Sequence, residues 1–407
     1  MSFNTDLSIA AFDYFLPDHQ IAQFPLADRS SSRLLYFNRK TNEIKDLNFK
    51  DLPQLLPNNS LVVFNETRVV MARLHFKRES GSRIEVFCLA PLSPLTEVQG
   101  AFQLGSGVEW KVLIGNAKKW KADEKLILSA NTEEGPVELM AQRCGIEEDA
   151  FRVRFEWSPS HLSFAAILEL FGKVPLPPYI GRKAEPEDES TYQTVYARTN
   201  GSVAAPTAGL HFTNEVFENL TQQGHKTCKT VLHVGAGTFK PVDNDRITEH
   251  HMHSEEVVIS RSLLETLKSE SKRPVVAIGT TTTRTLESIY WYAVLLEANP
   301  DALFLIDQWM PYSENSKISR PETIDLLLKC MDARKSDELK GNTSLLIAPG
   351  YTYRMVDALL TNFHQPKSTL LLLVSALIGD HWKRLYQHAI IQNYRFLSYG
   401  DACFFLP

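Results

Sequence analysis

The sequence lacks the marks of a secreted, membrane-spanning or zinc-binding protein. Its 5 cysteines are scattered, odd in number and without paired metal spacing, which favours a reducing compartment. The longest apolar run, at residues 370–378, is too short to cross a bilayer. The N-terminus has neither the basic leader nor the apolar stretch of a secretion signal. We therefore expect a cytoplasmic protein that binds no membrane and no metal.

The sequence also has little charge of one sign. With 43 Lys and Arg against 48 Asp and Glu, the formal net charge is -5, which provides no global positive field for a nucleic acid. DNA is therefore not expected as a partner. Any RNA contact has to be local, for example at Lys118, Lys119 and Lys121 around Trp120. Such clusters are also typical of solvated surfaces.

The composition is that of a folded chain longer than one typical core. Its 407 residues, 43% hydrophobic and 22% charged, predict two domains. Between residues 72 and 157 short Val-, Ile-, Phe- and Trp-containing segments alternate with turns, which predicts a small all-β barrel. After Pro206 strands alternate with helices, which predicts a mixed α/β domain. We expect a main domain of residues 1–71 and 158–407 with the barrel, residues 72–157, inserted in it.

Apolar runs and their boundaries predict the individual elements. A buried strand is expected at residues 61–64, and polar residues begin where it ends. The run at 370–374 is interpreted as a strand, although a buried helix is the alternative. The other strands are expected at 34–37, 83–89, 109–114, 125–128, 151–155, 230–234, 275–278 and 344–347, and helices at 214–222, 262–268 and 283–296.

Residues 275–288 (VVAIGTTTTRTLES) run from a predicted strand through a glycine into hydroxyl side chains and then a helix. A helix N-terminus exposes unpaired N–H groups and a positive dipole end, so this junction suits a phosphate, a carboxylate or a ribose hydroxyl. The alternative is that the threonines only cap the helix. The spacing excludes a Walker loop. The candidate ligand-binding residues are Gly279, Thr280, Thr281, Thr282 and Arg284.

Two further segments place small residues beside a histidine or a strand end. Residues 200–213 (NGSVAAPTAGLHFT) contain His211, and small side chains allow the backbone to approach a ligand closely. A tight structural crossover is the alternative. Residues 232–239 (LHVGAGTF) carry Gly235 and Gly237 but lack the third glycine of a dinucleotide fingerprint, so this signal is weak by itself.

The densest titratable cluster is His250, His251 and His253, followed by Glu255 and Glu256. The histidines are not spaced at i and i+4, and no cysteine set completes a tetrahedral site, so a metal is disfavoured. A histidine beside a carboxylate suits proton transfer, because imidazole titrates near neutral pH. A solvated loop is the alternative.

Residues 361–369 (TNFHQPKST) place Asn362 and His364 directly before the apolar run at 370–374. Polar residues at the mouth of a buried strand are where α/β proteins commonly bind ligands. We therefore expect both side chains at a site, with a hydrogen bond to the backbone as the alternative for His364.

Taken in order, these segments resemble the S-adenosylmethionine:tRNA ribosyltransferase-isomerase family of queuosine biosynthesis. The resemblance covers nearly the whole chain. Its longest stretches are LVVFNETRVVMARL at 61–74 and YQTVYARTNGSVAAPTAGLHFT at 192–213. The other matching stretches are 16–35, 174–179, 232–242, 251–255, 277–288, 349–369 and 394–402.

The resemblance implies an enzyme for which S-adenosylmethionine is a ribosyl donor and co-substrate, without a prosthetic group. The ribosyl unit passes to the aminomethyl group of a 7-deazaguanine at the wobble position of the tRNA anticodon loop. There it becomes an epoxycyclopentane, and adenine and methionine are released. The sulfonium acidifies the adjacent ribose carbon, so a base must take that proton and an acid must assist the departure of adenine. We expect such an enzyme to be a monomer.

The resemblance also suggests residue roles. Proton chemistry is expected from His211, from His253 with Glu255, and from His364, with base and acid left open. Donor binding is expected at residues 279–284, with Gly235 and Gly237. Base and RNA contacts are expected from Arg33, Tyr179, Tyr192, Gln193 and Asn362, since aromatic faces stack on splayed-out bases.

Three departures from the family pattern stand out. Thr191 occupies a place where arginine is usual, Met71 one where proline is usual, and residues 289–342 form a longer region than the family normally has. These departures leave two alternatives open: a divergent paralogue that uses a different acceptor, and a tRNA-binding protein that has lost catalysis. The retained histidine and Gly-Thr segments argue against the second.

Overall fold

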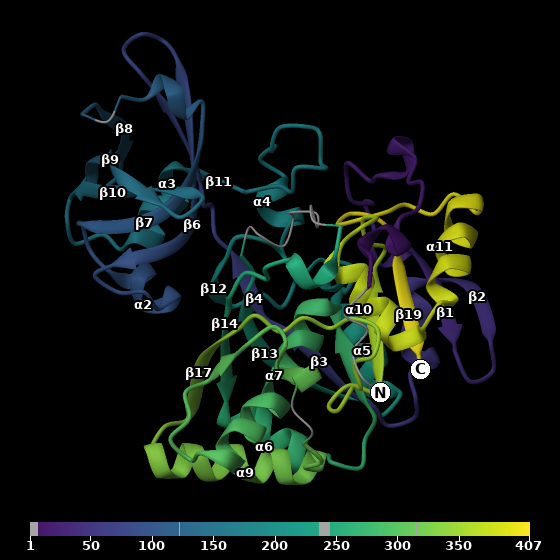
Figure 1. Cartoon of the computed structure of the whole chain (residues 1–407). Coiled ribbons are helices and arrows are strands. Elements are labelled where there is room, and N and C mark those ends of the chain that lie inside the picture. The colour runs from purple at the N-terminus through teal and green to yellow at the C-terminus, as the bar shows by residue number, and fades with distance from the viewer. Residues whose placement is uncertain (1–6, 122, 236–244, 314–315) are drawn as a thin grey trace.

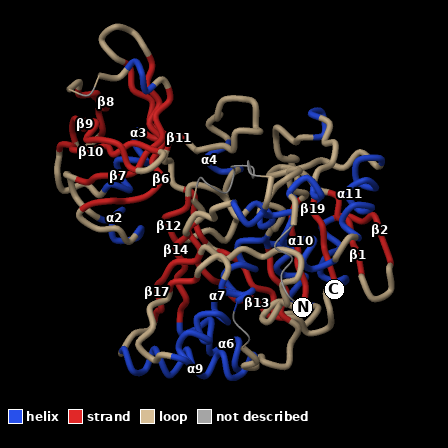
Figure 2. The backbone as a smooth tube through the Cα atoms, viewed as in Figure 1, coloured by secondary structure: helices blue, strands red, loops and turns tan. Residues whose placement is uncertain are grey.

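The computed structural model describes residues 7–121, 123–235, 245–313 and 316–407. Its two large sheets lie in separate parts of the molecule (Figure 1). A ten-stranded mixed sheet is covered by helices, and a seven-stranded antiparallel half-barrel projects to one side (Figure 2). The predicted fold class, a mixed α/β main domain with an inserted all-β unit, is confirmed.

The ten-stranded sheet is parallel at its centre and mixed toward its edges. In sheet order its strands are β16 (Leu305–Ile306), β17 (Glu338–Thr343), β14 (Glu255–Ser260), β13 (Lys226–His233), β3 (Leu61–Asn65), β15 (Val275–Ile278), β18 (Ala358–Asn362), β19 (Ala402–Leu406), β1 (Arg33–Asn38) and β2 (Glu43–Asn48). Strands β13, β3, β15 and β18 run parallel. Of these, β3, β15 and β18 are buried on both faces, which explains why β3 and β15 are continuous apolar runs in the sequence.

Alternate side chains of these strands build two cores, one on each face of the sheet. Val63 packs into the larger core, whereas Val62 and Phe64 pack into the smaller one. The larger core contains α6 (Arg261–Ser269), α7 (Gly279–Ala298), α9 (Arg320–Arg334), α10 (Thr369–Ile378) and α11 (His381–Ile391), and the smaller contains α1 (Leu52–Leu55) and α5 (Asn214–Gln222). Two short helices, α4 (Asp188–Thr191) and α8 (Met310–Ser313), lie in the connections.

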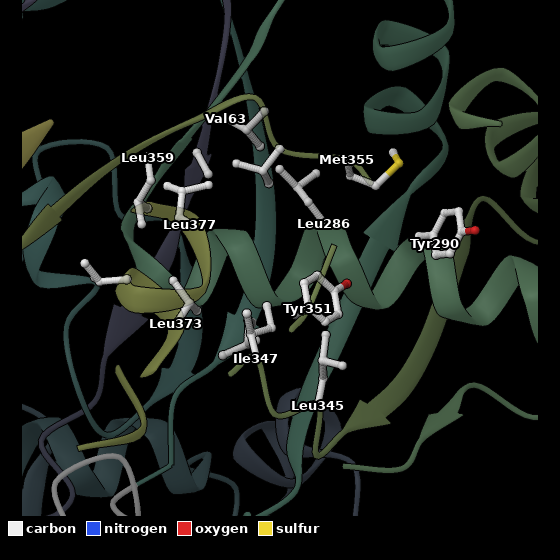
Figure 3. Packing of buried hydrophobic residues seen from close by; sticks show 14 of the residues in the cluster. Val63, Leu286, Tyr290, Leu345, Ile347, Tyr351, Met355, Leu359, Leu373 and Leu377 are labelled. Atoms are coloured by element: carbon white, nitrogen blue, oxygen red, sulfur yellow. The ribbon is translucent and has the colours of Figure 1, made fainter. Parts of the chain in front are cut away.

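Helix α7 lies at the centre of the larger core, with nearly all of its residues buried. Figure 3 shows Leu286 and Tyr290 of α7 among side chains such as Val63 and Leu373. Because this helix begins directly where β15 ends, its first turn is fixed relative to the parallel strands.

The half-barrel is built from consecutive antiparallel pairs. In sheet order its strands are β11 (Gly172–Lys173), β5 (Arg73–Lys77), β6 (Arg83–Ser93), β7 (Val108–Gly115), β10 (Ala150–Ser158), β9 (Gly135–Glu147) and β8 (Lys125–Thr132). Helices α2 (Val98–Gln103) and α3 (Phe164–Phe171) pack against Trp110 and Phe155. A two-stranded sheet of β4 (Thr67–Val69) and β12 (Thr199–Ser202) lies in the segments flanking this unit. Helix α3 and β11 follow residue 157, and the domain boundaries at 72 and 157 stay a prediction.

Two of the expected strands are wrong. Residues 370–374 belong to helix α10, whose N-cap Ser368 accepts a hydrogen bond from the Leu371 N–H at 3.2 Å. An apolar run without polar interruptions carries no periodicity that separates a buried helix from a buried strand. Residues 344–347 are irregular, and the strand β17 comes earlier, at Glu338–Thr343. This strand lies near the sheet edge and carries several polar residues, so no apolar run marks it in the sequence.

A fully buried carboxylate holds the segment that leads into β18. Glu287 of α7 accepts hydrogen bonds from the Tyr351 hydroxyl at 2.7 Å and from the N–H groups of Arg354 (3.0 Å), Met355 (3.0 Å) and Val356 (3.1 Å). Burial raises the pKa of this carboxyl group, and the hydrogen bonds act in the opposite direction. One side chain of α7 therefore orders the segment that precedes a central strand.

Glu287→Gln should lower the free energy of unfolding by about 2–3 kcal/mol, because an amide presents its own N–H groups to backbone donors. Urea unfolding of the full chain measures this change. Glu297→Gln, at an exposed position of the same helix, is the matched control and should leave stability within about 0.5 kcal/mol. Equal stability of the two variants would show that the Glu287 contacts contribute little.

Candidate functional site

The candidate site is a cavity with two lobes at the carboxyl ends of β15 and β18. The large lobe encloses about 770 Å³ of empty space, counting solvent at its mouth, and is lined mainly by residues 204–208, 279–281 and 361–365. The small lobe has about 420 Å³ of empty space, again counting open solvent, and is lined by residues 345–347 and by residues of other segments. Thr280, Thr281, Thr369 and Leu370 line both lobes. The lobes therefore adjoin, with these four residues in the walls of both.

The N-terminus of α7 separates the lobes. Gly279 has a φ of +88°, a conformation that glycine adopts without strain, and it allows the sharp turn from β15 into the helix. The N-cap residue Ile278 provides no side-chain hydrogen bond, so the alternative that a threonine caps this helix is wrong. Thr280 lines both lobes, and the Thr281 hydroxyl is buried without a partner among the described residues. The predicted helix N-terminus is present and lies beside both lobes, and ligand binding there stays a prediction.

The other predicted residues of this junction are turned toward protein groups. The Thr282 hydroxyl donates to the Ile278 carbonyl at 2.6 Å and is fully buried. Arg284 lines the small lobe, but its guanidinium forms a buried ion pair with Glu255 and donates to the Leu345 carbonyl at 3.2 Å. The expected fixed positive charge is thus compensated within the protein.

Glu255 is a structural partner of the site as well as a predicted catalytic residue. Besides its ion pair with Arg284, it accepts a hydrogen bond from the Gly235 N–H at 3.2 Å. These contacts connect β14, α7 and the end of β13. Gly237 lies outside the described residues. His253, at the end of the 245–253 segment, lines the small lobe.

His364 is one of the residues that line the large lobe. Its Nε2 lies 2.9 Å from the Thr361 hydroxyl, and Nδ1 has no hydrogen-bond partner among the described residues. The peptide is fixed on both sides, because its N–H donates to the Tyr386 hydroxyl at 3.1 Å and its carbonyl accepts from Tyr14. Burial lowers the pKa of His364 to about 3, so the imidazole is neutral near pH 7.

His211 lies behind the large lobe rather than in it. Its Nε2 is 3.3 Å from the Asn362 amide nitrogen, and its Nδ1 is 3.1 Å from the Ser32 hydroxyl. The Asn362 oxygen accepts from the Thr207 hydroxyl at 2.8 Å, which leaves the amide to donate to His211. Burial lowers the pKa of His211 to about 4. Both nitrogens of this neutral ring are therefore engaged.

The predicted substrate contacts divide into two groups. Tyr179 and Asn362 line the large lobe, where the Tyr179 hydroxyl lies 2.7 Å from that of Ser398. Arg33, Tyr192 and Gln193 line neither lobe. These three residues have structural partners of their own.

The three remote residues hold protein segments together. The Arg33 guanidinium carbon lies 3.7 Å from the centre of the Tyr394 ring. Tyr192 is fully buried with its ring edge-on to Tyr399, so its face is not open to a base. Gln193 bonds to both backbone groups of Val69, at 3.1 and 2.7 Å. A sequence motif does not separate such supporting contacts from ligand contacts.

Sequence reasoning missed three contributors to the site. Ser398 and Thr207 lie within matching stretches but carry no distinctive local pattern, and the sequence predicts residues 345–347 only as part of a strand. Among the described residues no set of three or more His, Cys, Asp or Glu side chains is arranged to hold a metal ion. In the described part of the chain no helix is both long and apolar enough to span a membrane.

Comparison with known protein families gives a match over nearly the full length of the chain. The family described as queuosine biosynthesis protein matches residues 9–405. The chain belongs to that family, which defines the class of protein that this fold and cavity represent.

The relatives within the family carry a more specific name. The S-adenosylmethionine:tRNA ribosyltransferase-isomerase of Syntrophomonas wolfei is 39% identical over 401 residues, covering 97% of this chain and 96% of the relative. The protein of the same name from Geotalea uraniireducens is also 39% identical, over 397 residues, covering 97% and 98%. A crystal structure of S-adenosylmethionine tRNA ribosyltransferase from Thermotoga maritima has 27% identity and a TM-score of 0.47, covering 97% of this chain and 99% of that one.

The buried neutral histidines make stability depend on pH. His364 has a pKa of about 3 in the folded chain against 6.5 as its ordinary value, so the unfolded chain binds the extra proton as the pH falls below 6.5. Folding stability is therefore lost progressively from about pH 6.5 downward. His364→Gln should remove about 2 kcal/mol of the stability loss between pH 6.5 and 4.5.

Urea unfolding at pH 6.5 and at pH 4.5 measures this effect. His19→Gln, at an exposed position, serves as the control and should leave the pH dependence unchanged. The same loss of stability in wild type and His364→Gln would contradict the assignment of a buried neutral imidazole.

Proposed function

We propose that this chain transfers the ribosyl group of S-adenosylmethionine to 7-aminomethyl-7-deazaguanine at the wobble position of tRNA and isomerises it, giving epoxyqueuosine-tRNA, adenine and methionine. The observation that carries this proposal is 39% identity to named ribosyltransferase-isomerases over 97% of the chain. The two-lobed cavity supports it, because a nucleoside donor and an incoming base both need space at one point. S-adenosylmethionine enters as a co-substrate and no prosthetic group is proposed.

His364 is the proposed base for the ribose carbon next to the sulfonium. Its ring lines the large lobe, and donation of the Nε2 proton to Thr361 leaves the Nδ1 lone pair available. A neutral imidazole can accept a proton as a base, whereas only the protonated ring can donate one as a general acid. This restricts His364 to the first proton transfer and leaves protonation of the departing adenine to another group, for which His253 in the small lobe is the proposed residue.

His211 is proposed as a positioning residue. Both of its nitrogens are engaged, and its contact with Asn362 orients an amide that lines the large lobe. The Arg284–Glu255 pair is proposed to shape the donor pocket, and Gly279, Thr280 and Thr281 to contact the donor. Tyr179 and Asn362 are proposed to meet the acceptor base, with Arg33 further out toward the anticodon loop.

Two departures from the family pattern receive a structural account that favours the main proposal over a changed acceptor. The longer region at 289–342 supplies half of α7, β16, α9 and most of β17, whose side chains enter the larger core. Near Thr191, Arg29 donates to the carbonyl groups of Ser190 and Gln193 at 2.9 and 2.7 Å. An arginine from another segment therefore supports the chain beside Thr191. A monomeric state and a cytoplasmic location stay predictions from the sequence.

Incubation of the purified chain with S-adenosylmethionine and tRNA carrying the aminomethyl-deazaguanine tests the proposal. Release of adenine with a matching mass increase in the tRNA is the expected result. Adenine release that depends on a different acceptor would favour the paralogue, and RNA binding without turnover would favour a binding protein.

His364→Ala should lower turnover at least about 100-fold, as expected on loss of a general base, while near-ultraviolet circular dichroism stays that of the wild type. His161→Ala, exposed in the half-barrel, is the matched control and should keep the full rate. Full activity of His364→Ala would remove this residue from the proton transfer.

A further inference from the structure

The small lobe has the character of a pocket for a neutral, flat ring. Most of its lining is aliphatic, from Met252, Leu345, Leu346, Ile347, Leu370 and Leu373. Its one guanidinium, that of Arg284, is compensated by the buried Glu255 carboxylate. A zwitterionic ligand would have to leave water without a free counter-charge here, which is costly. The lobe therefore selects against a charged ligand.

Ile347, in the wall of the small lobe, carries two backbone groups that are unpaired within the described part of the chain. Ile347 is 2% exposed, yet neither its N–H nor its C=O has a hydrogen-bond partner among the described residues. The other halves of the same two peptide groups are engaged: the Leu346 carbonyl accepts from the Tyr312 hydroxyl at 3.0 Å, and the Ala348 N–H donates to the same hydroxyl at 2.8 Å. Buried peptide groups without partners are rare in folded proteins. A ligand edge with one acceptor and one donor side by side would satisfy both.

We propose that the small lobe is the adenine subsite, in which the Ile347 N–H donates to the ring nitrogen N1 and the Ile347 carbonyl accepts from the 6-amino group. This assignment rests on the proposed function and deepens it. Of the two products that the donor yields, adenine is flat and neutral, whereas methionine is a zwitterion. The methionyl group then belongs in the large lobe or at its mouth.

The placement agrees with the position of the α7 N-terminus. Thr280 and Thr281 stand between the lobes, where the ribose that joins adenine to the sulfonium has to lie. The ribose then faces His364 across the large lobe, and the departing adenine faces His253 in the small lobe. One side of the donor is thus presented to a base and the other to a possible proton source.

Equilibrium binding of adenine and of L-methionine to the full-length chain, measured by calorimetry, tests the assignment. Met252→Trp places a larger side chain at a half-buried position in the wall of the small lobe. It should weaken adenine binding at least tenfold and leave L-methionine binding unchanged. Met140→Trp, half-buried on β9 in the half-barrel, is the matched control and should change neither affinity.

A second measurement needs no variant. Hypoxanthine reverses the donor and acceptor order at positions 1 and 6, so it should bind the wild-type chain at least tenfold more weakly than adenine. Equal binding of the two bases, or no binding of adenine at millimolar concentration, overturns the assignment. Loss of L-methionine binding instead of adenine binding in Met252→Trp also overturns it.

The turnover assay separates failure of this subsite from failure of the proposed function. If the wild-type chain releases adenine in the tRNA assay but Met252→Trp binds adenine normally, only the subsite is wrong. If the wild-type chain neither releases adenine from the donor nor binds it, the proposed function fails as well.

Discussion

The buried helix α7 is the constraint on which both lobes of the cavity depend. Its first turn begins at Gly279 and separates the lobes, and three side chains further along fix segments that come from elsewhere in the chain. Arg284 pairs with Glu255 of β14, Glu287 holds residues 354–356, and the Ser288 hydroxyl lies 2.7 Å from that of Thr343 at the end of β17. Since β14, β17 and the segment that leads into β18 all contact this helix through polar groups, a shift of α7 would deform both lobes together.

Buried polar contacts of this kind specify a position more than they add stability. Removing a charged pair such as Arg284 and Glu255 from water costs several kcal/mol per ion, and the attraction between the charges largely offsets that cost. The pair has its full set of contacts in only one register of β14 against α7. An aliphatic pair would allow β14 to shift slightly along α7. Such a shift would change the spacing between His253 and the threonines of α7.

The sequence allowed prediction of what depends on local pattern. The apolar runs of β3 and β15 and the glycine followed by threonines located the central strands and the helix end at the cavity. The strand predicted at residues 370–374 is wrong because an uninterrupted apolar run has no periodicity that separates a helix from a strand. Neither the pairing of Arg284 with Glu255 nor the burial of Tyr192 against Tyr399 could be predicted, since these contacts join segments that only the fold brings together. The N–H and C=O of Ile347, unpaired within the described residues, are backbone features that no side-chain motif encodes.

The hydrogen-bond pattern of the two buried histidines is the basis for the different roles proposed for them. Both rings are neutral because burial penalises the imidazolium form. In His211 both nitrogens have partners, so the ring fixes the Asn362 amide and cannot take a proton without breaking that contact. In His364 one nitrogen stays available at the lobe while two tyrosines fix the peptide. Because burial disfavours the protonated ring, the proposed base can hold a proton only briefly and has to pass it on.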